Sequence, residues 1–189
     1  MQCTAPFGKI PAFRISNQFP KLIDIQAVNL QLQNTLFAAS KMAGKHIYER
    51  SSSAGKRVQC NNGAKNHCIV LPDANKNKSI SQIVGAAFGA AGQRCMALSV
   101  AVFVGAANGW IPEIVDVASR LKVNAGHING ADLGPVISPE SKRRIIDLIQ
   151  SGVEEGASLS LDGRGIVVPD FKDGNFVGPT ILTSVKVRP

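Results

Sequence analysis

The stretch that best indicates the fold reads Gly89-Ala90-Ala91-Gly92-Gln93-Arg94-Cys95. It joins a helix predicted over residues 79–88, with Ser79 as its N-cap, to an apolar strand predicted over residues 98–104. Small residues in and after the helix permit very close packing, so we expect this helix to be buried. Tiny residues before a thiol also leave space for a ligand to approach the backbone and the sulfur.

The alternation of strand and helix continues in both directions from this stretch. Strands are expected over residues 35–38, 56–60, 67–71, 98–104, 159–161, 166–168 and 176–182, and helices over 42–50, 79–88, 112–121 and 139–150. Strands that alternate with helices predict an α/β sheet. Residues 1–34 hold no period of 2 or 3.6 for long, so we expect a divergent or disordered extension there.

Composition limits the class of protein. Of the 189 residues, 44% are hydrophobic and 18% are charged, which suits a packed core rather than a disordered chain. Lys and Arg number 21 against 13 Asp and Glu, but they are scattered and lack interleaved aromatic residues, so nucleic-acid binding is only weakly indicated and is not expected. Glycine and proline interrupt the longest uncharged run, so no membrane span is expected.

Four irregularly spaced cysteines, Cys3, Cys60, Cys68 and Cys95, are expected to be reduced thiols. The adjacent pair His67-Cys68 does not have the usual spacing of zinc ligands, so no metal site is expected. Cys95 can be a nucleophile only as a thiolate, and neighbouring side chains on a helix do not face each other, so Arg94 does not establish its activation. Taken alone, a buried and inert Cys95 is the better interpretation.

Several blocks, in the same order, resemble the aldehyde dehydrogenase superfamily, and within it the CoA-acylating methylmalonate (malonate) semialdehyde dehydrogenases. The resemblance covers about residues 35–184 and is close at residues 63–67, 72–75, 85–98, 131–135 and 174–180. It implies an α/β, aldehyde dehydrogenase-like fold. Residues 35–71 would be the end of a Rossmann-type, NAD-binding domain, and residues 72–189 an incomplete α/β catalytic domain that carries the thiol.

The resemblance also assigns roles to residues. The cysteine of the family's Gly-Gln-Arg-Cys motif is the nucleophile, which makes Cys95 the catalytic candidate. Ser40 and Gly44 match the loop that contacts NAD, in which Ala39 replaces the first glycine. Small residues between strand and helix are where phosphate-binding loops occur, although this loop by itself proves little. We assign Arg94 to the free carboxylate of the substrate, with a structural salt bridge as the alternative.

Asn61 occupies the position at which most hydrolytic relatives place a glutamate that activates water. An amide cannot serve as a general base, so slow attack by water and acyl transfer to CoA are expected. A CoA thiol ionises far more easily than water and can react without that base. The alternative is that Asn61 is only a turn residue.

The resemblance therefore implies NAD-dependent oxidative decarboxylation of methylmalonate or malonate semialdehyde, with acyl transfer from Cys95 to CoA. Propionyl-CoA or acetyl-CoA would be formed in valine and pyrimidine breakdown. It further implies a mitochondrial homo-oligomer, a tetramer at full length, and basic residues precede the first acidic residue, Asp24, as in a transit peptide. Because family members are more than twice as long, the alternative is an inactive fragment that retains only the fold or the oligomer contacts. A basic binding module is a third and more distant interpretation.

Overall fold

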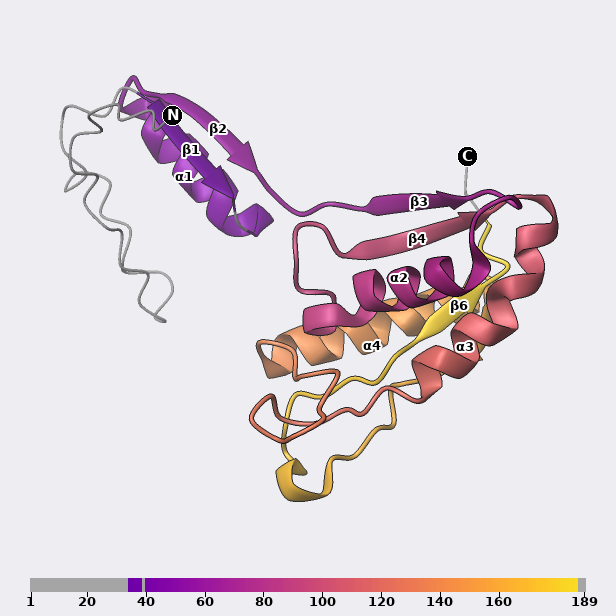
Figure 1. The fold of residues 1–189 in the computed structure, drawn as a ribbon. Helices are drawn as coiled ribbons and strands as arrows, with labels where there is room; N and C mark the ends of the chain where they lie inside the picture. Colours follow the sequence, from indigo (N-terminus) through magenta and orange to yellow (C-terminus); the bar gives the residue numbers. More distant parts are fainter. Residues whose placement is uncertain (1–33, 39, 187–189) are drawn as a thin grey trace, which may run out of the picture. The chain divides into compact units, whose positions relative to one another are not determined.

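The computed structural model describes residues 34–38 and 40–186, in two compact units that meet in sequence between Gly63 and Ala64. Each unit is described by itself (Figure 1). The extension expected over residues 1–34 lies, apart from its last residue, outside the described residues. No helix in the described part of the chain is long and apolar enough to cross a membrane.

The first unit is a β–α–β arrangement. The strands β1 (Asn34–Ala38) and β2 (Arg57–Asn61) pair in parallel, and α1 (Lys41–Ser53) connects them. The hydroxyl of Ser40 caps α1 by accepting a hydrogen bond from the backbone of Ala43 at 3.4 Å. The buried residues of α1 recur at helical spacing, which gives the helix one packed face. They are Ala43, Gly44, Ile47 and Ser51.

The second unit begins with β3 (Asn66–Val70), which pairs in parallel with β4 (Leu98–Phe103). The helix α2 (Lys76–Phe88) connects the two strands and packs on one face of their sheet (Figure 1). Because β3 pairs with β4, it belongs to the second unit. The division at residues 71 and 72, which the family resemblance implies, stays a prediction. Which unit binds cofactor and which carries the chemistry stays a prediction.

Two expectations about α2 were wrong. Asn75, not Ser79, caps the helix, because its side chain accepts a hydrogen bond from the backbone of Lys78 at 3.0 Å one turn earlier. The buried face consists of Ile80, Ile83 and Val84, and the small residues that follow are partly or fully exposed. Branched side chains bury more apolar area than glycine and alanine, so they decide which part of the helix enters the core.

The core of the second unit lies between α2, β3 and the following helices, η2 (Gly105–Trp110) and α3 (Ile111–Ser119). Ala107 and Ala118 are completely buried in it. Pro112 lies in the first turn of α3, where a missing backbone N–H costs nothing.

The rest of the second unit contains α4 (Pro139–Glu154) and the antiparallel strands β5 (Ser158–Leu161) and β6 (Ile181–Thr183). Ser138 caps α4 and accepts a hydrogen bond from the backbone of Ser141 at 3.1 Å. The strand expected over residues 166–168 does not form in this described segment. Of the strand expected over residues 176–182, only the end forms, and it extends to Thr183. The short helix η3 (Pro169–Phe171) lies between them.

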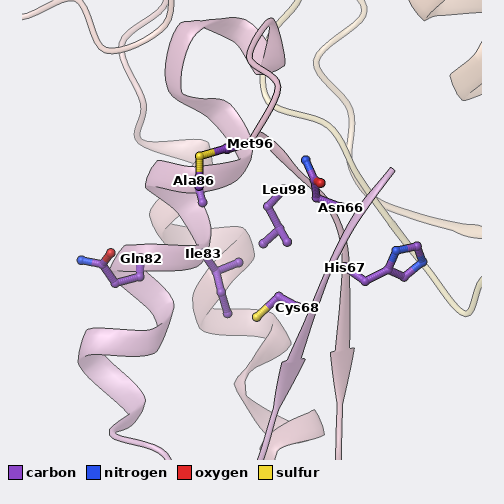
Figure 2. Close-up of a pocket in the computed structure, with 8 residues that line it drawn as sticks. All are labelled: Asn66, His67, Cys68, Gln82, Ile83, Ala86, Met96 and Leu98. Carbon is purple, nitrogen blue, oxygen red and sulfur yellow. The ribbon is translucent and has the colours of Figure 1, made fainter. Parts of the chain in front are cut away.

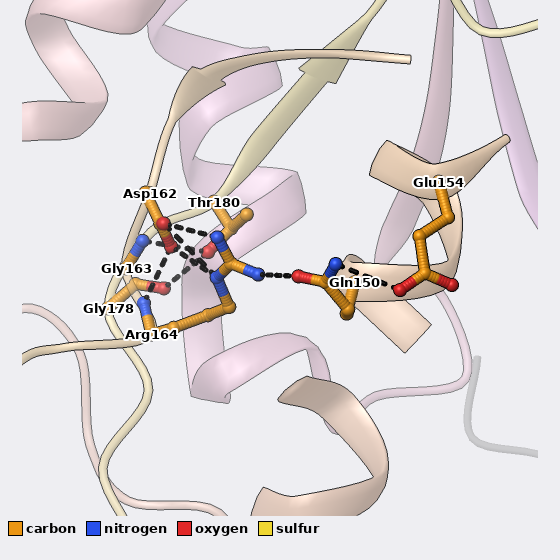
Figure 3. A network of polar contacts seen from close by, with 7 residues as sticks. All are labelled: Gln150, Glu154, Asp162, Gly163, Arg164, Gly178 and Thr180. Carbon is orange, nitrogen blue, oxygen red and sulfur yellow. Dashed lines mark hydrogen bonds and ion pairs between the residues drawn. The ribbon is translucent and has the colours of Figure 1, made fainter. Parts of the chain in front are cut away.

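A polar network links α4 to the chain that leaves β5 (Figure 3). Arg164 donates hydrogen bonds to both carboxylate oxygens of Asp162, at 2.9 and 2.7 Å, and to the side chain of Gln150 on α4 at 2.8 Å. The side-chain and backbone hydrogen bonds from Arg164 hold the pKa of Asp162 below its usual value. Nearby, Gly178 donates its backbone N–H to the carbonyl of Gly163 at 2.8 Å, so the two segments approach closely.

Candidate active-site turn

Cys95 lies in the turn between α2 and β4, and its free thiol is exposed. The turn begins with η1 (Gly89–Gly92), within which Ala90, Ala91 and Gly92 have φ angles of 53°, 52° and 69°. Side chains disfavour this left-handed conformation, by about 1–2 kcal/mol for each non-glycine residue. Backbone held in this way persists only where its surroundings enforce it, and it occurs often at functional sites.

Asn66, at the start of β3, supports the turn from one side. Its side-chain amide donates to the backbone carbonyl of Cys95 at 2.8 Å and to that of Ala97 at 2.9 Å. The two bonds use both hydrogens of the amide nitrogen. They fix the carbonyl groups on either side of Met96, and therefore the path of the backbone that carries Cys95.

Gln93 supports the turn from the other side. Its amide nitrogen donates to the carbonyls of Ala90 and Pro135, each at 3.2 Å, and its amide oxygen accepts from the backbone of Ile137 at 2.9 Å. One side chain thus joins the cysteine turn to the segment that leads into α4.

Arg94 points back to the end of α2. Its Nη2 donates to the carbonyls of Gly85 at 3.0 Å and Ala86 at 3.1 Å, which lie in the last turn of the helix. A cation is favourable at this negative end of the helix. Both bonds come from one nitrogen, so Nη1 and Nε have no hydrogen-bond partner among residues 34–38 and 40–186. The salt bridge that we considered for Arg94 is not among the ion pairs of this part of the chain.

A small pocket of about 370 Å³ lies beside the turn, between α2 and the two parallel strands (Figure 2). Its apolar wall includes Ile83, Ala86 and Leu98, and Met96 closes one end. Asn66 lines it as well, whereas Cys95 does not. The pocket can take a small aliphatic group, and the sulfur of Cys95 lies outside its lining.

The residues matched to the NAD loop lie in the first unit, at the start of α1. Ser40 is the N-cap, and the first turn of this 13-residue helix contains no acidic side chain. Free backbone N–H groups at such an end suit an anionic phosphate. Gly44 is buried, and a Cβ there would collide with the side chain of Asn62. The absence of a side chain at Gly44 therefore makes room for the side chain of Asn62, while Ser40 and the start of α1 fit a phosphate group.

Asn61 is the last residue of β2 and is exposed, opposite Ala38 in the parallel register. It belongs to the first unit, and Cys95 belongs to the second. Among the described residues, no group of His, Cys, Asp and Glu could hold a metal ion.

The sequence pattern missed Asn66 and Gln93 as supports of Cys95. Both lie within or next to blocks that resemble the family, but their partners are up to 44 residues away in sequence. Only the folded chain brings these amides to the carbonyls they bind.

Residues 27–188 match the model of the aldehyde dehydrogenase family, and the chain belongs to this family. Its parallel strands, its α/β units and the Gly-Gln-Arg-Cys turn agree with that assignment.

Among relatives, the chain is 58% identical over 163 residues to the mitochondrial, acylating methylmalonate-semialdehyde/malonate-semialdehyde dehydrogenase of Mus musculus, covering 86% of this chain and 29% of the relative. The crystal structure of methylmalonate-semialdehyde dehydrogenase from Oceanimonas doudoroffii is similar, with a TM-score of 0.76, 39% identity, and coverage of 84% of this chain and 33% of that one.

A betaine aldehyde dehydrogenase from Staphylococcus aureus in complex with NAD+ has a TM-score of 0.76 and 26% identity, over 82% of this chain and 31% of that one. The chain thus spans about a third of the length of the proteins it matches. The resemblance to methylmalonate-semialdehyde dehydrogenases is therefore confirmed by both sequence and structure comparisons.

Proposed function

We propose that the chain carries the thiol-bearing part of a CoA-acylating aldehyde dehydrogenase acting on methylmalonate or malonate semialdehyde, with Cys95 as the nucleophile. The observation that carries the proposal is the exposed Cys95 thiol at the end of a turn of small, left-handed residues. The names of the relatives supply the reaction class and a mitochondrial location, which we extend to this chain. A homo-tetramer stays a prediction.

The reaction begins when the Cys95 thiolate adds to the aldehyde carbon, forming a carbon–sulfur bond and a thiohemiacetal. NAD, when bound, supplies the acceptor for the hydride that leaves this carbon. Cys95 then holds an acyl group as a thioester. The substrate's free carboxylate departs as CO₂, because the thioester carbonyl stabilises the electron pair left on the adjacent carbon, which takes up a proton. The CoA thiolate attacks the thioester carbonyl and expels the Cys95 thiolate.

Other residues bind the substrate or the cofactor, or favour CoA as the acyl acceptor, in this reaction. Arg94 holds the substrate carboxylate through a single N–H, that of Nη1 or of Nε, since Nη2 donates to the end of α2. Ser40 and the start of α1 hold a phosphate of NAD. Asn61 offers no base to water, which favours the CoA thiol as acyl acceptor.

The last step can be tested in reverse and without NAD. Purified chain is incubated with propionyl-CoA, and a propionyl group moves from CoA to the Cys95 thiol while CoA thiol is released. Intact mass and peptide mass analysis should find one propionyl group on Cys95. Cys95→Ala should abolish it, and the matched control Cys68→Ala should not.

A propionyl group on Cys60 or Cys68 in place of Cys95 would contradict the proposal. No acylation at all would favour the second candidate, an inactive fragment that retains the fold. The specific observation in favour of that candidate is that Cys95 does not line the pocket beside its turn.

A further inference from the structure

We propose that Asn66 and Gln93 are positioning residues, which together hold the strained Cys95 turn and so orient the sulfur for acyl transfer. This inference rests on the proposed function of Cys95. Neither side chain needs to touch the substrate, because both act on the backbone of the turn.

The geometry of β3 explains why a side chain is needed at Asn66. The parallel register is regular from His67 onward but shifts between Asn66 and His67, so that Asn66 lies opposite Leu98 and His67 opposite Val100. A backbone ladder is interrupted at such an irregularity. The side-chain amide of Asn66 takes the place of backbone hydrogen bonds between the strands here, because it donates both of its hydrogens to the carbonyls of Cys95 and Ala97.

Gln93 holds the other end of the same turn. Its bond to the carbonyl of Ala90 closes the turn locally, and its bonds to Pro135 and Ile137 anchor it to the chain before α4. Since the amide donates at one atom and accepts at the other, a carboxylate of the same shape cannot reproduce these contacts.

The energy stored in the turn makes such supports necessary. Ala90 and Ala91 both have positive φ angles, a left-handed conformation that is unfavourable for a residue with a side chain. Without lateral contacts the backbone would relax and move the sulfur. A shift of about 1 Å in a reacting group can lower a rate on the order of a hundredfold.

The experiment compares Asn66→Ala, Asn66→Asp, Gln93→Ala and Gln93→Glu with the parent chain. Asn129→Asp and Gln59→Glu, at exposed positions, are the matched controls. Each protein is examined for propionyl transfer from propionyl-CoA to Cys95 at increasing reagent concentration, for amide hydrogen exchange, and for its urea unfolding midpoint.

At saturating propionyl-CoA, the transfer rate should fall about tenfold to a hundredfold in all four variants, with little change in the half-saturating concentration. The amides of Ala97 and Ile137 should exchange faster, while those in the middle of α4 should not. Because both residues act on one turn, the double variant Asn66→Ala/Gln93→Ala should lose less than the product of the two single losses.

The pH dependence separates positioning from a general loss of stability. In Asn66→Asp, the carboxylate faces two carbonyls that it repels, but its protonated form can donate one hydrogen bond. The ratio of variant to parent rate should therefore rise as pH falls, and it should stay constant for Asn66→Ala. Equal pH profiles for the two variants, or rate losses that only follow the unfolded fraction, would overturn the proposal.

Failure of the parent chain to take a propionyl group would refute the proposed function, not the positioning. Amide hydrogen exchange requires no chemistry at Cys95, so it then tests whether the turn depends on Asn66 and Gln93. Unchanged exchange at Ala97 and Ile137 in the four variants would show that the turn does not depend on Asn66 and Gln93. Faster exchange confined to the turn would support its dependence on them.

Discussion

The guanidinium group of Arg94 lies in the space that a side chain on Gly89 would occupy. A Cβ built on Gly89 would come within 2.8 Å of Nη2 and 3.1 Å of Cζ. The missing side chain lets the cation lie against the carbonyls of Gly85 and Ala86 at the end of α2. Gly89 itself has a φ of −52° and a ψ of 134°, which any residue can adopt, so contact and not backbone freedom explains the glycine here.

Gly89→Ala should therefore displace Arg94 and lower the free energy of unfolding by about 1 kcal/mol, the contribution typical of one hydrogen bond. In an Arg94→Ala background the same change should be neutral or stabilising by about 0.5 kcal/mol, because alanine restricts the unfolded chain. Urea unfolding of the four proteins measures this coupling. Equal effects of Gly89→Ala in the two backgrounds would contradict it.

Cys95 should be the most nucleophilic thiol of the chain. It is exposed, whereas Cys60 and Cys68 are partly buried, and Cys3 lies outside the described residues. Limited labelling with iodoacetamide, followed by peptide mass analysis, ranks the four. First reaction at Cys60 or Cys68 in the folded protein would show that the assignment is wrong.

Arg94→Lys, in a full-length version of the protein, should raise KM for the semialdehyde acid much more than KM for propionaldehyde. A lysine keeps the charge, but its single nitrogen cannot donate to the end of α2 and to a substrate carboxylate in the geometry of the guanidinium. Steady-state kinetics with both aldehydes give the comparison. Equal changes in KM would leave Arg94 only its contact with the end of α2.

The 189 residues alone should oxidise aldehyde poorly or not at all, even with NAD and CoA supplied. Hydride transfer requires a closely held nicotinamide, and these 189 residues span 29% of the length of the mouse relative. The rate of NADH formation from malonate semialdehyde measures this oxidation. Turnover at about 1 s⁻¹ or faster, ordinary for an enzyme, would contradict the expectation.

Asp162→Asn should make the stability of the protein, measured as its urea unfolding midpoint, less dependent on pH in acid. The contacts with Arg164 lower the pKa of the Asp162 carboxyl, so the stability they contribute is present above the unfolded pKa of about 3.9 and is lost as pH falls through the lower folded value. Urea midpoints measured between neutral and strongly acidic pH should show a shallower decline in the variant than in the parent. Asp170→Asn, at another exposed position, is the control, and an equal slope in Asp162→Asn and the parent would contradict the assignment.

Sequence patterns predicted the elements that depend on local chemistry. The strands near residues 35–38, 56–60 and 67–71 and the helices near 42–50 and 112–121 are confirmed to within a few residues, because hydrophobic period and capping act over one or two turns. The strand expected at 166–168 was wrong, since these residues form a loop in which Val168 is buried and Val167 is exposed. The family and the α/β fold class, which the motif blocks indicated, are confirmed by the family match.

The sequence determined which thiol is the catalytic candidate, because its contiguous Gly-Gln-Arg-Cys motif resembles that of the family. The tertiary structure alone decided what holds that thiol: Asn66 and Gln93 reach carbonyls of Cys95 and Pro135 that are 29 and 42 residues away. It also decided that Arg94 turns toward α2 and that β3 joins β4. A hydrogen bond depends on separation in space, and only the folded backbone brings residues distant in sequence within bonding distance.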